Sequence, residues 1–232
     1  MNLKSIIKRT LSGAVYVAIM WFGTSHSEFS FNLLFGIILL VCLYEMYRLR
    51  KGKTKILAYT YVLVPFLLIL LIAGGTFEYL IFSRIAAFFG MPLSYYPENP
   101  FDPSIILLMF ILTWTFDTFA YLVGIQYGKH KIIPSVSPKK SWEGFIGGFL
   151  LTIIAAYLSQ KIFIHIALRD ILFVSIILPF TATLGDLIAS HYKREAGVKD
   201  SGNFIPGHGG MLDRMDAFTI TIPVIYIIDN LL

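Results

Sequence analysis

Seven apolar runs, each about as long as a membrane-crossing helix, constrain the fold of this chain more than any other feature. They lie at about residues 10–26, 29–45, 57–74, 104–128, 142–160, 170–190 and 216–232. The runs are too long, and alternate too little, to be strands of an outer-membrane barrel. With 56% hydrophobic and only 14% charged residues, most of this apolar surface must face lipid. The sequence therefore predicts an all-α fold, a polytopic membrane helix bundle with about seven transmembrane helices, and excludes a soluble enzyme.

The positions of the basic residues predict how these helices are oriented. Most of the 19 Lys and Arg residues fall in the N-terminal tail and in the loops near 48–55, 129–141 and 191–215. Seven spans place all four segments on one side, which the positive-inside rule makes the cytoplasmic side. We therefore expect the N-terminus in and the C-terminus out. The apolar segment 77–89 is short and contains charged residues, which favours an interfacial or re-entrant helix.

The organisation along the chain predicts two parts. Residues 1–103 would hold N-terminal transmembrane helices and the segment near 77–89, and residues 104–232 would hold the catalytic helices. The two polar loops of the second part, 129–141 and 191–215, are expected in the cytoplasm. Because neither is long enough for a soluble domain, chemistry must occur at the membrane surface or within the helices.

Acidic and basic residues gather around the second of these loops. Asp186 and Ser190 are four residues apart and share one face of a helix, as do Asp213 and Asp216, which are three apart. Carboxylate oxygens bind hard divalent cations, and Lys and Arg bind phosphate oxygens. The pattern therefore predicts a magnesium and polyphosphate site. Its basic members are Lys193, Arg194, Lys199 and Arg214.

Two further features have both a functional and a structural interpretation. Gly207, Gly209 and Gly210 precede a helix, whose N-terminus would attract a phosphate, although a capped turn needs glycines too. His208, between them, would contact phosphate or base, or stabilise the turn. Asp117 lies within an apolar run, where a carboxylate is a functional candidate by default. The alternative for Asp117 is a structural hydrogen bond to a neighbouring helix.

Residues 190–216 resemble the signature of the CDP-diacylglycerol synthases, also called phosphatidate cytidylyltransferases. The segment follows the pattern S-x-apolar-K-R, then K-D, then P-x-H-G-G-x-x-D-R-x-D, with Tyr192 where an aliphatic residue or Phe is more usual. A second block resembles the D-x-x-A-Y and S-P-K-K-[ST]-W-E-G stretches of the family. It includes Asp117, Lys139 and Lys140, followed by Ser141, which can cap the next helix. The two blocks cover nearly half of the chain.

This resemblance implies transfer of CMP from CTP to phosphatidate, giving CDP-diacylglycerol and pyrophosphate in phospholipid biosynthesis. It implies Mg²⁺ held by Asp186 and Asp213, with Asp216 assisting a second cation or a metal-bound water. Lys193, Arg194 and Lys199 would neutralise phosphates as part of the catalytic set. The substrate-binding residues it implies are Ser190, His208, Gly209, Gly210, Arg214, Lys139, Lys140 and Asp117.

The expected partners are CTP, phosphatidate and membrane lipids, with no nucleic acid, and a homodimer is compatible with the sequence. The expected location is the cell (inner) membrane with the site facing the cytoplasm. Two alternatives stay open at this point. One is an ion-coupled membrane transporter, with Asp117 and Asp186 as intramembrane coupling groups. The other is a cytidylyltransferase acting on another lipid phosphate.

Overall fold

The computed structural model describes residues 3–74, 84, 101–134 and 136–229, and this part of the chain is mostly helical. Each apolar run expected to be helical forms a helix. The helices are α1 (Leu3–Ser25), α2 (Glu28–Leu49), α3 (Ile56–Ile72), α5 (Ser104–Tyr127), α6 (Trp142–Ser159), α7 (Leu168–Glu195) and α8 (Leu212–Asp229). The segment 77–89, expected at the membrane interface, lies outside the described residues except for Arg84.

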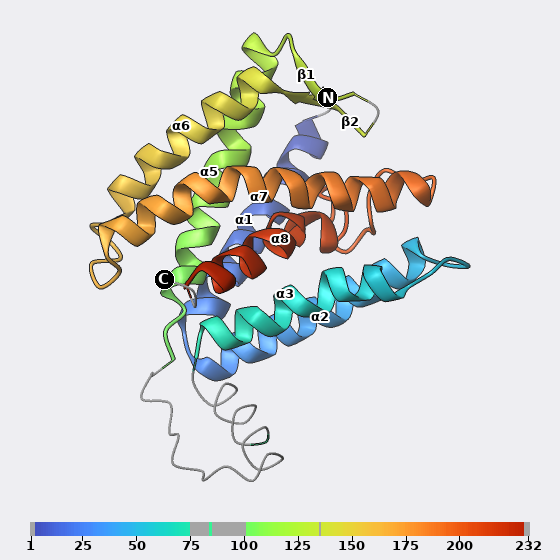
Figure 1. Cartoon of the computed structure of the whole chain (residues 1–232). Coiled ribbons are helices and arrows are strands. Elements are labelled where there is room, and N and C mark those ends of the chain that lie inside the picture. Colours follow the sequence, from blue (N-terminus) through green and yellow to red (C-terminus); the bar gives the residue numbers. More distant parts are fainter. Residues whose placement is uncertain (1–2, 75–83, 85–100, 135, 230–232) are drawn as a thin grey trace.

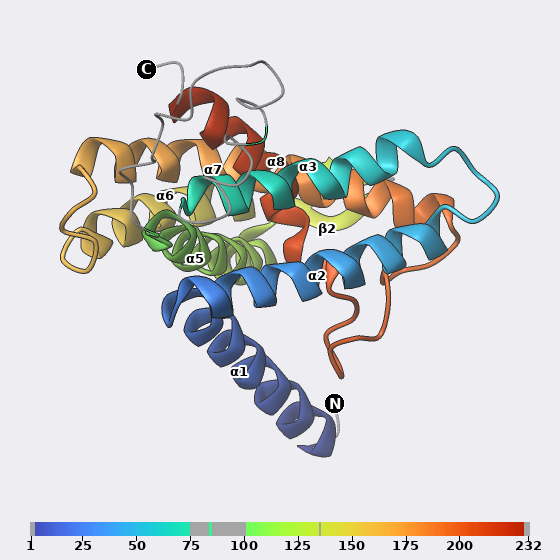
Figure 2. The ribbon, with the colours of Figure 1, turned by 90° about the horizontal axis from the view of Figure 1, so that it is seen from below.

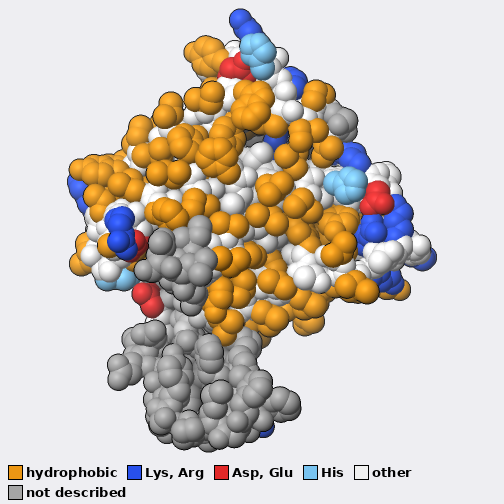
Figure 3. All heavy atoms as spheres, in the orientation of Figure 1, with side chains coloured by type: hydrophobic (Ala, Val, Ile, Leu, Met, Phe, Trp, Pro, Cys, Tyr) orange, Lys and Arg blue, Asp and Glu red, His pale blue; other side chains and the backbone are white. Residues whose placement is uncertain are grey.

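The lengths and surfaces of these helices are those of a multi-pass membrane protein. Helices α2, α5, α6 and α7 are each long and apolar enough to cross a bilayer, and α3 is a shorter apolar helix of 17 residues. Hydrophobic side chains cover most of the face in Figure 3. Charged side chains gather at its upper end, over the β-hairpin, and at its right, near the α2–α3 turn and the end of α7. The number of crossings and their direction stay predictions.

A short β-hairpin departs from the all-α expectation. Strands β1 (Lys131–Ile133) and β2 (Ser137–Ser141) pair antiparallel within the loop that joins α5 to α6. The pairing satisfies backbone groups that a polar loop leaves without partners, a need that helical periodicity does not reveal. The hairpin leads directly into α6, where the Ser141 side chain accepts a hydrogen bond from the Gly144 amide at 3.2 Å. This confirms Ser141 as the cap of α6.

Small residues set the distance between α5 and α6, which pack along their length. A Cβ atom on Gly144 would lie 2.5 Å from the Ala120 carbonyl oxygen, and one on Gly148 would lie 2.9 Å from the Phe116 carbonyl oxygen. Helices in lipid gain no hydrophobic burial from association, so close backbone contact of this kind stabilises their packing.

Helices α2 and α3 form an adjacent pair in Figure 1, and Figure 2 shows the N-terminal end of α1 projecting away from the other helices. The turn between α2 and α3 contacts the C-terminal end of α7. Arg50 and Lys53 both form ion pairs with Glu195, and the Arg50 guanidinium lies 5.3 Å from the centre of the Tyr192 ring. Arg50 and Lys53, which sequence analysis used to predict orientation, therefore also join the α2–α3 turn to the C-terminal end of α7.

Candidate active site

Helices α7 and α8 are in close backbone contact at Gly185. A Cβ atom on Gly185 would lie 2.1 Å from the backbone carbonyl oxygen of Asp216, so only glycine permits this packing. The Tyr61 hydroxyl of α3 donates a hydrogen bond to the Gly185 carbonyl oxygen at 2.8 Å. At this junction the carboxyl groups of Asp186 and Asp216 contact each other. The packing thus brings together two acidic residues from separate helices.

The first cation of this junction comes from the β-hairpin. Lys140 Nζ lies 2.5 Å from Asp186 Oδ2, and both side chains are about one third exposed or less. Ser190, one turn further along α7, has its hydroxyl 3.5 Å from Asp186 Oδ1, which confirms that the two residues share a face. Lys139 is exposed on β2. Of the two adjacent lysines, Lys140 is the one that reaches the carboxylates.

Asp213, in the first turn of α8, binds four groups. Its Oδ1 accepts from Lys193 Nζ at 2.6 Å, and the two side chains are each only 9% exposed. Its Oδ2 accepts from the Ser201 amide at 2.9 Å, the Ser201 hydroxyl at 3.1 Å and the Gly210 amide at 3.0 Å. Asp213 therefore organises the α7–α8 loop. Each carboxylate oxygen has two lone-pair sites, so Oδ1 retains capacity for a further ligand.

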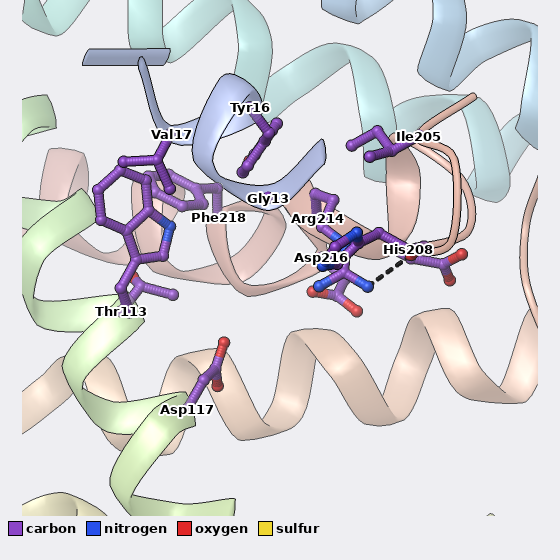
Figure 4. A pocket seen from close by; sticks show the side chains of 12 residues that line it. Gly13, Tyr16, Val17, Thr113, Asp117, Ile205, His208, Arg214, Asp216 and Phe218 are labelled. Carbon is purple, nitrogen blue, oxygen red and sulfur yellow. Dashed lines mark hydrogen bonds between the residues drawn. The ribbon is translucent and has the colours of Figure 1, made fainter. Parts of the chain in front are cut away.

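Two cavities adjoin this cluster and share the side chains of Asp117, His208 and Arg214. The smaller, of about 220 Å³, also meets Asp213 and Asp216 at one end and apolar side chains of α1, α5 and α8 at the other. Figure 4 shows Asp117 of α5 pointing into this space from the side opposite α1. The larger, of about 1080 Å³, is lined by Lys199 and the glycine-containing loop, including Gly209. Charged groups of both signs thus surround space for a polar ligand.

Helix α1 contributes to the same region. Ser12 donates a hydrogen bond to the Pro206 carbonyl oxygen at 2.8 Å, and its hydroxyl lies 3.0 Å from His208 Nδ1. Arg214 Nη2 donates to the His208 carbonyl oxygen at 2.6 Å, the dashed line in Figure 4. His208 is therefore held from two sides while it lines both cavities. Sequence analysis did not connect α1 with the site.

The N-terminus of α8 differs from its predicted role as a phosphate site. The amides of Met211 and Leu212 donate to the Glu45 carboxylate of α2, at 3.0 and 2.9 Å, and the Gly210 amide is bound by Asp213. Sequence analysis missed Glu45. The signal was available, because a lone carboxylate in an apolar run is a functional candidate by the argument already applied to Asp117.

Not every predicted phosphate contact faces the cavities. Lys193 is buried in its ion pair with Asp213, and neither cavity is lined by it. Arg194 is exposed, and its Nη1 donates to the Val198 carbonyl oxygen at 3.0 Å just beyond the end of α7. Lys199 and Arg214 are the predicted cations that line cavity surface.

The residues at the α7–α8 junction suit a magnesium ion in their chemistry. Across residues 3–74, 84, 101–134 and 136–229, no three His, Cys, Asp or Glu side chains form a group that could hold a metal. The pair Asp186 and Asp216 is nevertheless unusual, because two carboxylates in contact repel each other unless a proton or a cation compensates them. Mg²⁺ is commonly held by one or two carboxylates together with substrate phosphates. The observed pair matches that requirement.

Fold and site together define a class: a multi-pass helical membrane protein with a carboxylate and cation cluster beside two polar cavities. Comparison with known proteins gives the family. The sequence model of the cytidylyltransferase family matches residues 55–232, and the chain belongs to that family.

Curated relatives carry the name phosphatidate cytidylyltransferase. The protein from Staphylococcus epidermidis is 41% identical over 144 residues, covering 61% of this chain and 55% of the relative. The one from Haemophilus influenzae is 40% identical over 149 residues, covering 60% and 50%. The one from Thermotoga maritima is 44% identical over 137 residues, covering 54% and 49%. The matched region therefore spans about half the length of each relative.

Proposed function

We propose that this protein is a phosphatidate cytidylyltransferase, which transfers CMP from CTP to phosphatidate and releases pyrophosphate. One observation carries the proposal: Asp216, which contacts Asp186, lines the smaller cavity together with Arg214, and Arg214 and Lys199 line the adjoining larger cavity. A triphosphate and a lipid phosphate both need cations, and a magnesium ion needs carboxylates. The names of the relatives support the choice of substrates.

The reaction makes modest demands on acid–base chemistry. An oxygen of the phosphatidate phosphate attacks the α-phosphorus of CTP, and the bond from that phosphorus to the oxygen bridging the β-phosphorus breaks. Because the attacking phosphate is already an anion, the protein must mainly align the two phosphates and compensate their charge. Lys199 and Arg214 are positioned along the cavities for this compensation, and His208 borders both.

The carboxylates of Asp186 and Asp216 would hold Mg²⁺, with Asp213 contributing through the free capacity of Oδ1. When bound, the ion would neutralise developing charge on the phosphates. Lys140 already compensates Asp186 from the hairpin, and Lys193 compensates Asp213 from within α7. Asp186 and Asp213 would therefore keep a cationic partner after the products leave and before new substrates bind.

We further propose that the site faces the cytoplasm, in a protein of the cell (inner) membrane with its N-terminus inside. Arg50, Lys53 and Lys140 all form ion pairs with the C-terminal half of α7, which supports placing their loops on one side, as the positive-inside rule requires. CTP would enter from this side and phosphatidate from the bilayer. The homodimer stays a prediction.

The test uses purified protein in lipid nanodiscs with cytidine-labelled CTP, phosphatidate and Mg²⁺. We expect label in the lipid fraction and release of pyrophosphate in equal amounts. Asp186→Asn is the control variant, because Asp186 contacts Asp216 in the proposed magnesium site. Asp213 is less suitable for this purpose, because its carboxylate also holds the α7–α8 loop in place. It should fold normally and lose transfer at saturating Mg²⁺.

Parallel reactions with a polyprenyl phosphate and an archaeal-type ether lipid test the other lipid phosphates. Transfer to one of these in place of phosphatidate would correct the substrate. A folded protein that transfers label to none of them would refute the proposed function, as would an Asp186→Asn variant with substantial activity.

A further inference from the structure

Glu45 is a carboxylate of α2 that is buried, with 4% of its surface exposed, and is bound by neutral groups of a single loop. It accepts from the Ser201 hydroxyl at 2.7 Å, the Met211 amide at 3.0 Å and the Leu212 amide at 2.9 Å. These contacts join residues that are more than 150 positions apart in the chain. Burying a carboxylate is costly, so hydrogen bonds must compensate for its lost hydration.

The contacts make Glu45 a cap for α8 that comes from another helix. The first amides of a helix have no partner within it, and an acceptor with negative charge is stabilised there by the helix dipole. Capping residues normally precede their own helix, but here α2 supplies the acceptor. The same carboxylate also binds Ser201, which lies within the loop that leads from α7 to α8. Glu45 thereby fastens both ends of the segment 201–212.

The loop is shaped around this carboxylate. A Cβ atom on Gly202 would lie 2.5 Å from Glu45 Oε1, and one on Gly210 would lie 2.4 Å from Glu45 Oε2. Real Cβ atoms do not approach other atoms so closely, so a side chain at either position would displace Glu45 or the loop. Gly210, which the sequence predicts to bind substrate, makes room for Glu45 and donates its amide to Asp213.

A single hydroxyl connects Glu45 to the proposed magnesium site. Ser201 Oγ lies 2.7 Å from Glu45 Oε2 and 3.1 Å from Asp213 Oδ2, and the Ser201 amide also donates to Asp213. Arg214 follows Asp213 on α8 and lines both cavities. A shift of the α8 N-terminus would therefore move a carboxylate and a cation of the site together.

We propose that Glu45 is a positioning residue for the active site, and that α2 holds in place the loop and the α8 N-terminus, which carries Asp213 and Arg214. The inference rests on the proposed function for its effect on catalysis. The family match begins at residue 55, after Glu45, so that match does not include this contribution. A fragment holding only residues 104–232 would lack the cap.

The test variant is Glu45→Gln, which preserves side-chain volume. Its amide oxygen can accept one backbone N–H, but its NH₂ group would face the other donor. Outer partners of metal-binding residues typically change activity by about 10–100-fold. We expect kcat to fall within that range while KM for CTP and for phosphatidate change by less than about threefold. Hydrogen exchange of the amides in the segment 210–213 should accelerate by about tenfold or more.

Glu28→Gln is the matched control on the same helix. The two positions are 17 residues apart along α2, or about 25 Å. The control should match wild-type kinetics and exchange. If Glu45→Gln does not fold, Ser201→Ala removes the hydroxyl between Glu45 and Asp213 and should change kcat and exchange in the same direction.

Unchanged exchange at residues 210–213, or unchanged kcat, in folded Glu45→Gln protein would overturn the proposal. A loss expressed only in KM would do so as well. If the wild type transfers no label, the proposed function fails on its own, and the exchange measurement still decides whether Glu45 holds the loop.

Discussion

Replacing Gly185 by alanine tests whether the contact between α7 and α8 builds the active site. The added methyl group would lie 2.1 Å from the Asp216 carbonyl oxygen and 3.3 Å from Thr219 Oγ1. The first neighbour is backbone and cannot rotate away. Because nonbonded atoms pack at about 3.5–4 Å, the two helices must separate by about 1 Å or more.

Two consequences follow from this separation, one for stability and one for activity. Overpacking of a close contact costs about 1–3 kcal/mol of folding free energy. A displacement of about 1 Å between reacting or metal-binding groups costs about 100-fold in rate. Since Asp186 follows Gly185 directly and Asp216 is the residue pushed away, Gly185→Ala should lose about 100-fold in activity at a temperature where the variant is still folded.

The assays are thermal unfolding in detergent and transfer of label from CTP into lipid in nanodiscs. The control is Gly36→Ala on α2, where a Cβ atom would meet nothing within 4 Å. The control should be neutral or stabilised by up to about 1 kcal/mol, since alanine favours helix over glycine. A Gly185→Ala protein with the melting temperature and rate of the control would show that the contact does not set the geometry of the site.

Three further predictions concern individual contacts. Lys193→Met leaves the carboxylate of Asp213 buried without its cation and should reduce the free energy of unfolding by about 3–5 kcal/mol. An unchanged chemical unfolding curve would show that this ion pair does not stabilise the fold. Lys140→Met removes the cation that pairs with Asp186 and should lower turnover by about 10–100-fold. The control, Lys131→Met on exposed β1, should stay within about twofold of the wild-type rate. Equal rates for the two variants would show that Lys140 has no role in turnover. Gly202→Ala pushes the Glu45 carboxylate out of place and should lower kcat as Glu45→Gln does. Combining the two changes should cause no additional loss of kcat, because both act on the same contact. Additive losses in the double variant would show that the two changes act independently.

The helices and the family could be predicted from the sequence, because both depend on local patterns. Apolar runs of sufficient length form helices in lipid, where every backbone group must be satisfied within the segment. The four-residue spacing of Asp186 and Ser190 placed them on one face, which the structure confirms. Family membership followed from residue identities in the two motif blocks, and the family match confirms it.

The β-hairpin and the partners of each carboxylate could not be predicted in this way. Lys140 meets Asp186 only because the hairpin brings its side chain to α7, and Arg50 meets Glu195 only because the α2–α3 turn lies beside the end of α7. The predicted phosphate site at the start of α8 depended on its amides being available. Glu45 binds them from a distant helix.

The sequence by itself determined that this is a helical membrane protein of the cytidylyltransferase family, and it predicted a set of acidic and basic site residues. Only the tertiary structure decided that Asp186 contacts Asp216, that Lys193 is committed to Asp213, and that α2 caps α8. The physical reason is that helix formation depends on neighbours within a few residues. Contacts between helices depend instead on how whole surfaces pack, and here that packing is set by single glycines such as Gly185.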